Sequence, residues 1–471
     1  MDKSFGLPYD ARSPETARVK DMSSVSQFQP RVAPVEPADR ATSTDADPLS
    51  WFGQMIPHCK EFALTAHAAG KPIVGIMCEY APRELIMAAG GVPVCLCGGD
   101  PDTIPAAETH LPANLCPLIK STYGYLVEKA NPFLEMADLV IAETTCDGKK
   151  KMFELMGEAR PTYLMELPQK EDDPAALEQW TREMHKLKQF LERRYKVTVT
   201  NEKIHAAIAT MNRERALRRQ LAELMKRDSP PLTGRQLLDF KSIISGIAAD
   251  LEQYEKALQV FANAFGVHPS GCGKPDTLRR EHQAARRDLH AAGRTEVHGD
   301  SPALGESAKL RESPATSHSK VRVLLTGVPL VHGAERVMDI IEQHGGLVVC
   351  QENCSGLKPI LEDVPVDAAD PVRALAEKYY HLPCSVKTPN NQRMEILRQL
   401  AREYRADCVI ELIWQACLTY AIESFRVKRL VEQELGLPYL RIETDYSPLD
   451  SPRIAVRVEA LVETVRSRAV T

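Results

Sequence analysis

The chain has 471 residues, which is enough for about three domains at the usual ~100–200 residues each. Lysine and arginine total 59 and aspartate and glutamate 64, so the net charge is −5 and the basic excess of many nucleic-acid-binding proteins is absent. The apolar stretches fall far short of the ~20 residues that a membrane helix needs, and the first residues lack the apolar core of a secretory signal. We therefore expect a cytoplasmic protein with no nucleic-acid or membrane partner.

The first part of the chain divides into a tail and an α/β domain. Residues 1–47 are rich in Ser, Pro, Asp, Arg and Ala and lack a sustained apolar period, which predicts a disordered tail. Over residues 48–172, short apolar runs alternate with helical patterns. Strands are expected at 72–77, 92–96, 138–142 and 162–166, with helices between them. This alternation is typical of a parallel sheet covered on both faces.

The rest of the chain is expected to hold a helical bridge, a linker and a second α/β domain. Residues 173–267 show long helical periods, with Asp173 and Asn201 as expected N-terminal caps. Residues 268–319 are dominated by Gly, Ser, Ala, Pro and charge, which is typical of a flexible linker or insertion. Over residues 320–471, strands are expected at 321–326, 346–350, 408–413 and 438–442, and helices at 333–344, 371–380, 392–404 and 417–434. The predicted fold class is α/β, with two doubly wound parallel-sheet domains joined by a helical segment.

The cysteines give the first indication of function. The chain has twelve, and without a secretory signal they favour metal binding or catalysis over disulfides. Five stand after a strand, in a loop or at a helix start, where the crevice of an open α/β sheet lies: Cys116, Cys146, Cys354, Cys384 and Cys417. A helix start also favours the thiolate, which is the form that binds metal. Any one of them alone is equally well explained as a small buried packing residue, but five in such positions indicate a shared site.

The remaining cysteines carry less weight. Those in or beside strands are expected to be packing residues, and two others to be incidental: Cys95, Cys97, Cys350 and Cys408 in the first group, Cys59 and Cys272 in the second. No Cys-x-x-Cys pair of zinc-finger spacing lies among the candidates. Dispersed thiolates from two domains favour an iron–sulfur cluster, for which all-sulfur ligation is common.

Six segments around these residues carry a resemblance to a known family. They are 75–90, 114–124, 143–153, 352–356, 415–424 and 442–446. Over about residues 51–268 and 320–465, the chain resembles the superfamily of 2-hydroxyacyl-CoA dehydratases and benzoyl-CoA reductases, the 2-hydroxyglutaryl-CoA dehydratase D-component family. Within it, the chain is most similar to the double-cubane cluster branch.

The resemblance implies flavodoxin-like domains with strongly reducing 4Fe-4S cubanes in the cleft between them. It also implies an anaerobic homodimer, a small-molecule or acyl-CoA substrate, and a separate ATP-hydrolysing activator with its own iron–sulfur cluster that supplies electrons. By residue-to-residue correspondence, Cys116, Cys146 and Cys417 would hold one cubane and Cys354 and Cys384 would serve a second, possibly sulfide-bridged, cubane. Cys78 is the sixth candidate ligand.

Two departures from the relatives concern the second cubane. The segment 326–330 lacks a cysteine that relatives often carry, and Val386 stands where they can have a further thiol. The second cubane is then completed by Cys78, by a non-cysteine group, or not at all, so a protein with one cubane is the alternative.

Several other groups flank the candidate ligands, and each has a structural as well as a functional explanation. A run of three lysines would offset cluster charge or dock an activator, or else form a solvated basic turn: Lys149, Lys150 and Lys151. The reduction potential of a cluster would be tuned by Glu143, Asp147 and Gln415. Protons would be moved by His332 and His381, and acid and base roles would fall to Glu443 and Asp445. The segment 269–274 fails as a phosphate loop because Pro275 replaces the required Ser or Thr, and no Gly-x-Gly-x-x-Gly follows a strand.

Three functions follow in order of preference. The first is a double-cubane iron–sulfur reductase that an activator supplies with electrons. The second is a 2-hydroxyacyl-CoA dehydratase subunit that removes water through a ketyl radical. The third, from another class, is a non-catalytic thiolate metal-binding scaffold or electron carrier.

Overall fold

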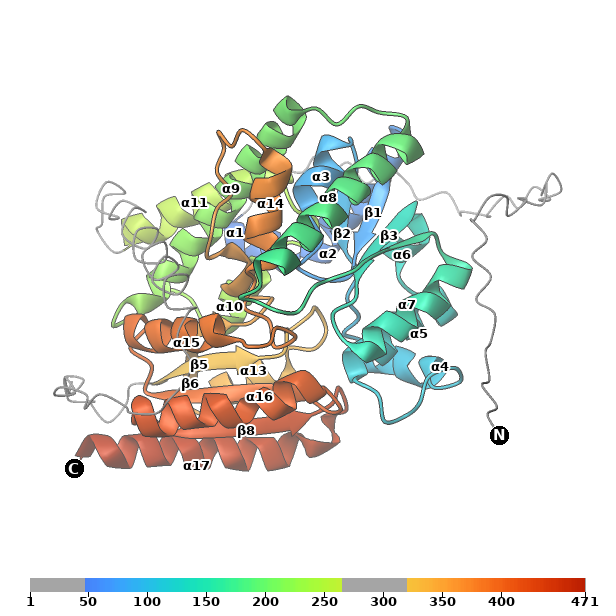
Figure 1. The fold of residues 1–471 in the computed structure, drawn as a ribbon. Helices are drawn as coiled ribbons and strands as arrows, with labels where there is room; N and C mark the ends of the chain where they lie inside the picture. Colours follow the sequence, from blue (N-terminus) through green and yellow to red (C-terminus); the bar gives the residue numbers. More distant parts are fainter. Residues whose placement is uncertain (1–46, 265–319, 471) are drawn as a thin grey trace, which may run out of the picture. The chain divides into compact units, whose positions relative to one another are not determined.

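A computed structural model describes residues 47–264 and 320–470 (Figure 1). The predicted tail, apart from Asp47, and the predicted linker at 268–319 with Cys272 lie outside the described residues. Among the residues described, no helix is both long and apolar enough to cross a membrane.

The first part of the described chain contains a four-stranded parallel sheet. Its strands are β1 (Ile73–Ile76), β2 (Val92–Cys95), β3 (Leu139–Glu143) and β4 (Thr162–Met165), in the order β2-β1-β3-β4. The helices of this part are α1 (Pro48–Gly53), α2 (Met55–Ala68), α3 (Arg83–Ala88), α4 (Ile104–Ala107), α5 (Pro117–Glu128), α6 (Pro132–Met136) and α7 (Asp147–Ala159). Every residue of the central strands β1 and β3 is buried, as expected for a sheet covered on both faces.

Four helices follow the first sheet: α8 (Pro174–Tyr195), α9 (Asn201–Glu223), α10 (Gly234–Asp239) and α11 (Ala248–Ala264). Helix α8 packs on the first sheet through Trp180, Met184 and Leu187, which are fully buried with Val74 and Ile141. Asp173 caps α8 as predicted. The prediction of Asn201 as a cap was wrong by one residue, because the Thr200 side chain caps α9 and Asn201 begins it.

The second sheet repeats the arrangement of the first. Its strands are β5 (Val321–Gly327), β6 (Gly346–Glu352), β7 (Cys408–Trp414) and β8 (Tyr439–Thr444), all parallel, in the order β6-β5-β7-β8. The helices are α13 (Arg336–Gln343), α14 (Pro371–Tyr380), α15 (Asn391–Glu403), α16 (Leu418–Arg429) and α17 (Ser451–Val470). The strands expected in both sheets are confirmed, and so is the α/β fold class. Helix α17, which packs on β8 and α13, was not predicted.

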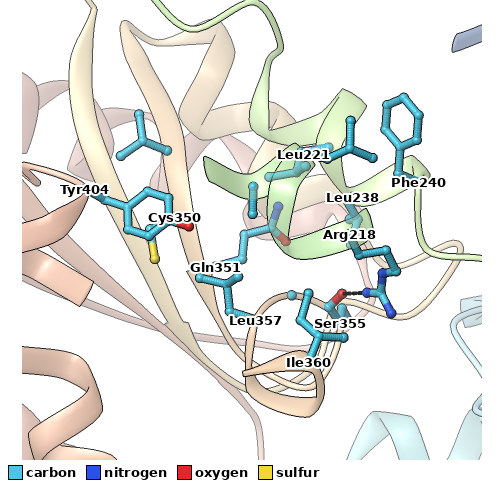
Figure 2. Close-up of a pocket in the computed structure, with 14 residues that line it drawn as sticks. Arg218, Leu221, Leu238, Phe240, Cys350, Gln351, Ser355, Leu357, Ile360 and Tyr404 are labelled. Atoms are coloured by element: carbon cyan, nitrogen blue, oxygen red, sulfur yellow. Dashed lines mark hydrogen bonds between the residues drawn. The ribbon is translucent and has the colours of Figure 1, made fainter. Parts of the chain in front are cut away.

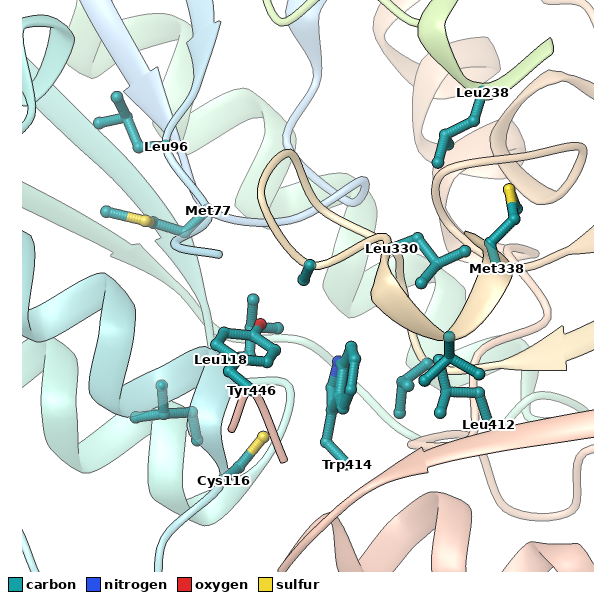
Figure 3. Packing of buried hydrophobic residues seen from close by; sticks show 14 of the residues in the cluster. Met77, Leu96, Cys116, Leu118, Leu238, Leu330, Met338, Leu412, Trp414 and Tyr446 are labelled. Atoms are coloured by element: carbon teal, nitrogen blue, oxygen red, sulfur yellow. The ribbon is translucent and has the colours of Figure 1, made fainter. Parts of the chain in front are cut away.

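One apolar cluster connects the two sheets and supports the site (Figure 3). It contains Met77 and Leu118 from the first α/β unit with Trp414 and Tyr446 from the second. The Tyr446 hydroxyl donates to the Gly98 carbonyl over 3.1 Å, and a Cβ on Gly99 would lie 2.2 Å from the His332 carbonyl oxygen. The loop after β2 is therefore in close contact with the second α/β unit.

The strand order decides where a ligand can bind. In each sheet the second strand lies on one side of the first strand, and the third and fourth strands lie on the other side. The strand order therefore reverses between the neighbours β1 and β3 in the first sheet, and between β5 and β7 in the second. Ligands of open α/β sheets bind outside the carboxyl ends of the strands at this point. Cys78 follows β1, Cys146 follows β3 and Cys417 follows β7.

Candidate functional site

Three of the six candidate cysteines occupy the same structural position. Cys116, Cys146 and Cys417 are the N-cap residues of α5, α7 and α16. Backbone N–H groups in the first turn of the following helix lie near each sulfur and favour its thiolate form. A helix N-terminus carries partial positive charge, so each of these positions stabilises a thiolate.

These three cysteines, the first triplet, come together from both α/β units. Cys417 and Cys116 interact directly, which lowers the pKa of Cys116 and raises the pKa of Cys417 far above its usual value. Cys146 interacts electrostatically with both Cys116 and Cys417, and burial raises its pKa. Residues that are distant in the sequence therefore meet at one point.

The other three candidates form a second triplet. Cys78 lies in the loop after β1, Cys354 in the loop after β6, and Cys384 in a turn after α14. Cys78 interacts electrostatically with Cys354 and Cys384, and these two interact with each other. Burial raises the pKa of Cys354 to about 12 and that of Cys78 far above its usual value.

Two further contacts relate the loops that carry these thiols. The Cys146 thiol interacts electrostatically with Cys384, so the first triplet lies beside the second. The Lys241 ammonium donates to Glu79 Oε1 over 2.7 Å and to the Cys354 carbonyl over 2.8 Å. It thereby connects the loop after β1 to the loop after β6. The structure brings all six sequence-predicted cysteines into one region.

Cys95 and Cys97 add two thiols that the sequence analysis treated as packing residues. They stand two residues apart, Cys95 as the last residue of β2 and Cys97 just after it. Cys97 interacts with Cys95, which lowers the pKa of Cys95 to about 6, and with Cys78. It also donates to the Met77 carbonyl over 3.2 Å. The Cys-x-Cys spacing at a strand end was the available signal. Cys350 and Cys408 are buried as predicted.

Two charged groups lie among the thiols. Both carboxylate oxygens of Glu143 are buried without a hydrogen-bond partner among the described residues, and burial raises its pKa to about 8. The Lys149 ammonium donates to the Met77 carbonyl over 2.8 Å and faces Cys78, Cys97 and Cys146. Lys149 is therefore buried among the thiols, unlike the two lysines that follow it in the sequence. Those two, Lys150 and Lys151, pair at the surface with Asp147 and Glu154.

The other flanking groups are held at or near the surface. Asp147 is 97% exposed at its side chain, and Gln415 is exposed. The remaining four have the following partners: His332 lies 3.6 Å from Glu335, His381 contacts the Glu377 carbonyl at 2.7 Å, Glu443 pairs with Arg441 at 2.6 Å, and Asp445 accepts from the Ser447 amide at 2.8 Å. These contacts favour the structural explanation for each group.

The spacing of the thiols tests which kind of metal group they fit. Across the described ranges, no three of these cysteines have their sulfur atoms within 4.8 Å of one another. A single tetrahedral ion needs such close ligands, whereas a cubane spreads its thiolates over a wider cage. The donor set is rich in sulfur, buried and accompanied by Lys149, so the residues present fit iron–sulfur clusters better than one zinc ion.

A separate small pocket lies between α9, α10 and β6 (Figure 2). Its lining is mostly apolar and includes Leu221, Phe240, Leu357 and Tyr404. The Arg218 guanidinium donates to the Ser355 carbonyl over 3.4 Å at its edge. None of the six candidate cysteines lines this pocket, so it is distinct from the cysteine site.

Comparison with known proteins agrees with the resemblance. The family model described as 2-hydroxyglutaryl-CoA dehydratase, D-component, matches residues 78–465. The chain is 37% identical over 397 residues to a putative dehydratase subunit YjiM of Escherichia coli, covering 84% of this chain and 91% of that protein. It is 22% identical to the (R)-phenyllactyl-CoA dehydratase beta subunit of Clostridium sporogenes, covering 88% and 97%. It is also 23% identical to the beta subunit of the lactoyl-CoA dehydratase of Anaerotignum propionicum, covering 84% and 92%. Benzoyl-CoA reductase of Thauera aromatica has a related subunit as well. The chain therefore belongs to the 2-hydroxyglutaryl-CoA dehydratase D-component family and is an enzyme of the dehydratase or reductase type.

Proposed function

We propose that the chain is a low-potential iron–sulfur reductase of the double-cubane type. It receives electrons from a separate ATP-hydrolysing activator and reduces a small-molecule substrate. The observation that carries this proposal is the arrangement of six thiols as two triplets, related through Cys146 and Cys384. One cubane would need only one of these triplets.

Each triplet would hold one cubane. Cys116, Cys146 and Cys417 would hold the first, and Cys78, Cys354 and Cys384 the second. The position of Cys78 beside the other two supports its role as the ligand that replaces the thiols missing near residues 326–330 and 386. When bound, such clusters supply single electrons at low potential.

The protein's own groups would set the properties of such clusters. Backbone N–H groups at three helix starts lie near the sulfur atoms of the first triplet, and such dipoles would raise a cluster's reduction potential by stabilising its added charge. The buried cation of Lys149 acts in the same direction. Trp414 and Tyr446, both buried, exclude water from the side of Cys116 (Figure 3).

The second candidate is a 2-hydroxyacyl-CoA dehydratase subunit with a single cubane at the first triplet. The relatives named as dehydratase beta subunits favour it. Such a protein would remove water from a 2-hydroxyacyl-CoA through a ketyl radical and would need a differing partner subunit. A zinc-binding scaffold is disfavoured by the spacing of the thiols described above.

Iron and acid-labile sulfide analysis of anaerobically purified protein tests the proposal. We expect about eight irons per chain from two cubanes, and a content lowered by about half in both Cys417→Ala and Cys384→Ala. Cys408→Ala is the matched control, because Cys408 is a fully buried thiol in β7, and it should keep the full content. About four irons with no effect of Cys384→Ala would establish the dehydratase alternative instead. Zinc without labile sulfide would overturn both.

The proposal also covers the oligomeric state, the cellular location and the domain boundaries of the protein. We propose a homodimer that works in an anaerobic cytoplasm, with domain boundaries at 48–172, 173–267 and 320–471. Analytical ultracentrifugation and limited proteolysis test the oligomeric state and the boundaries.

A further inference from the structure

A second group of potential metal ligands lies apart from the six candidate cysteines. His58 and Cys59 are neighbours in α2, and Asp250 is in the first turn of α11. One ligand atom from each residue lies within 4.8 Å of the other two. Cys59 and Asp250 are 0% and 1% exposed. Cys59, which lies in a helix, is predicted from the sequence to be incidental, and Asp250 is far from it along the chain.

The polar atoms of this group are incompletely satisfied. Asp250 Oδ1 accepts from Trp51 Nε1 over 2.9 Å and pairs with His58 Nε2 at 3.2 Å. Asp250 Oδ2 and His58 Nδ1 are buried without a hydrogen-bond partner among the described residues. Leaving buried polar groups unsatisfied is unfavourable, and one ligand atom from each of the three residues lies within 4.8 Å of the others, so the group is arranged to hold a further ligand.

We propose that His58, Cys59 and Asp250 form a mononuclear site for a divalent transition-metal ion, Zn²⁺ by preference. Imidazole nitrogen, thiolate sulfur and carboxylate oxygen are the three donor types that zinc binds in proteins. With a thiolate and a carboxylate, the charge of a bound Zn²⁺ is balanced inside the protein. This inference is independent of the iron–sulfur function proposed above, since none of its residues belongs to either triplet.

Neighbouring groups are placed to orient these ligands. The Trp51 ring stacks on His58 with centroids 4.7 Å apart and an angle of 26° between the planes, and its N–H holds Asp250. The Ser242 hydroxyl lies 3.3 Å from the Cys59 sulfur. Outer contacts of this kind fix ligand orientation, and their loss typically weakens metal binding by 10–100-fold, so we expect roughly that effect from Trp51→Phe.

The site would fasten the N-terminal helices to the rest of the fold. α1 and α2 precede the first strand, while Asp250 lies in the first turn of α11. Ser242 adjoins Ile243, whose carbonyl accepts from the Cys95 amide over 2.8 Å. A metal ion at this point links α2, α11 and the segment that runs beside β2. The inferred role is structural, because an ion that binds only the folded state stabilises it.

Titration of the anaerobically purified full-length protein with Co²⁺, after removal of zinc by a chelator, tests the site. Co²⁺ bound to a thiolate has a characteristic near-ultraviolet charge-transfer band. We expect this band in the wild type at about one ion per chain, with zinc displacing it, and its loss in Cys59→Ala and Asp250→Asn. Cys408→Ala and Cys384→Ala should keep it.

Each outcome decides the matter. A band that persists in Cys59→Ala, or that follows Cys384→Ala instead, would overturn the site, and so would a folded wild-type protein with no band. Circular dichroism of each variant checks folding, and the wild-type titration decides the question even if a variant does not fold. Iron and sulfide content measured on the same samples reports separately on the iron–sulfur proposal.

Discussion

The buried side chain of Arg393 contacts several carboxylates in the second α/β unit, and its replacement should lower the free energy of unfolding strongly. Its guanidinium is fully buried and contacts three carboxylates: Glu352 at 3.4 Å, Glu411 at 3.4 Å, and Glu423 in a close ion pair. It also donates to Thr326 Oγ1 over 2.9 Å. Glu352 belongs to β6, which leads to Cys354, and Glu423 belongs to α16, which begins after Cys417. Arg393 thus joins elements that carry cysteines of both triplets.

The structure sets the size of the expected effect. Removing one partner of a buried ion pair costs about 3–5 kcal/mol, because the remaining charge is left unpaired in a low dielectric. Each carboxylate keeps at least one other partner: Lys358 at 3.1 Å and the Thr326 hydroxyl for Glu352, Tyr439 for Glu411 at 2.6 Å, and Asn390 for Glu423 at 2.7 Å. We therefore expect Arg393→Met to lower the free energy of unfolding by about 3 kcal/mol, the lower end of that range.

Urea denaturation followed by circular dichroism measures this effect. Arg393→Lys keeps the charge but not the planar fork that reaches several carboxylates, so it should lose about 1–2 kcal/mol. Arg213→Met is the control, since Arg213 pairs with Glu255 at the surface, with side chains 50% and 42% exposed, and should lose less than about 1 kcal/mol. An Arg393→Met protein as stable as the Arg213→Met protein would refute the reasoning.

Three further predictions concern Glu143 at the end of β3, the contact between the two sheets, and helix α8 of the helical bridge. Burial raises the pKa of Glu143 from 4.5 to about 8, so the contribution of Glu143 to the free energy of unfolding should decline as the pH rises from about 5 to 8. Denaturation midpoints measured across this pH range should show the decline in the wild type, and Glu143→Gln should remove it. Gly99→Ala should destabilise by about 1–3 kcal/mol through a clash with the His332 carbonyl, while Gly53→Ala, with no atom within 4 Å of its new methyl, should be neutral or slightly stabilising in the same urea assay. Leu187→Ala should cost about 2–5 kcal/mol by calorimetry, since its side chain is fully buried under the first sheet, and a smaller loss would mean that α8 packs loosely.

The sheets could be predicted because their central strands are largely apolar runs. β7 has seven buried residues in succession, and β1 and β3 are buried throughout, a pattern that surface loops do not show. Helix α17 was missed although its signal was present. Its buried residues Ile454, Val458, Leu461 and Val462 follow a helical period, but arginines and the prolines at 448 and 452 interrupt the sequence around it.

The site could be predicted only in part, for a physical reason. Cysteines at strand ends are visible in a sequence, and so the six candidates could be chosen individually. Which thiols meet depends on strand order and on how the two sheets pack, and neither is written in local residue patterns. The approach of Cys97 to Cys78 depends on β2 lying next to β1, and the group of His58, Cys59 and Asp250 depends on α2 packing against α11.

The contact between the two sheets has a further consequence for the proposed clusters. Cys417 meets Cys116 where Trp414 and Tyr446 share a core with Met77 and Leu118. Burial of apolar area stabilises the contact between the two units but does not fix their relative orientation, whereas a cubane requires its thiolates in a defined geometry. The directional contacts, such as Tyr446 to the Gly98 carbonyl, must therefore set the alignment of the two units. Since a cluster that bridges both units would bind only the aligned state, its binding energy would in turn hold them together, and loss of the clusters should loosen this interface before it unfolds either sheet.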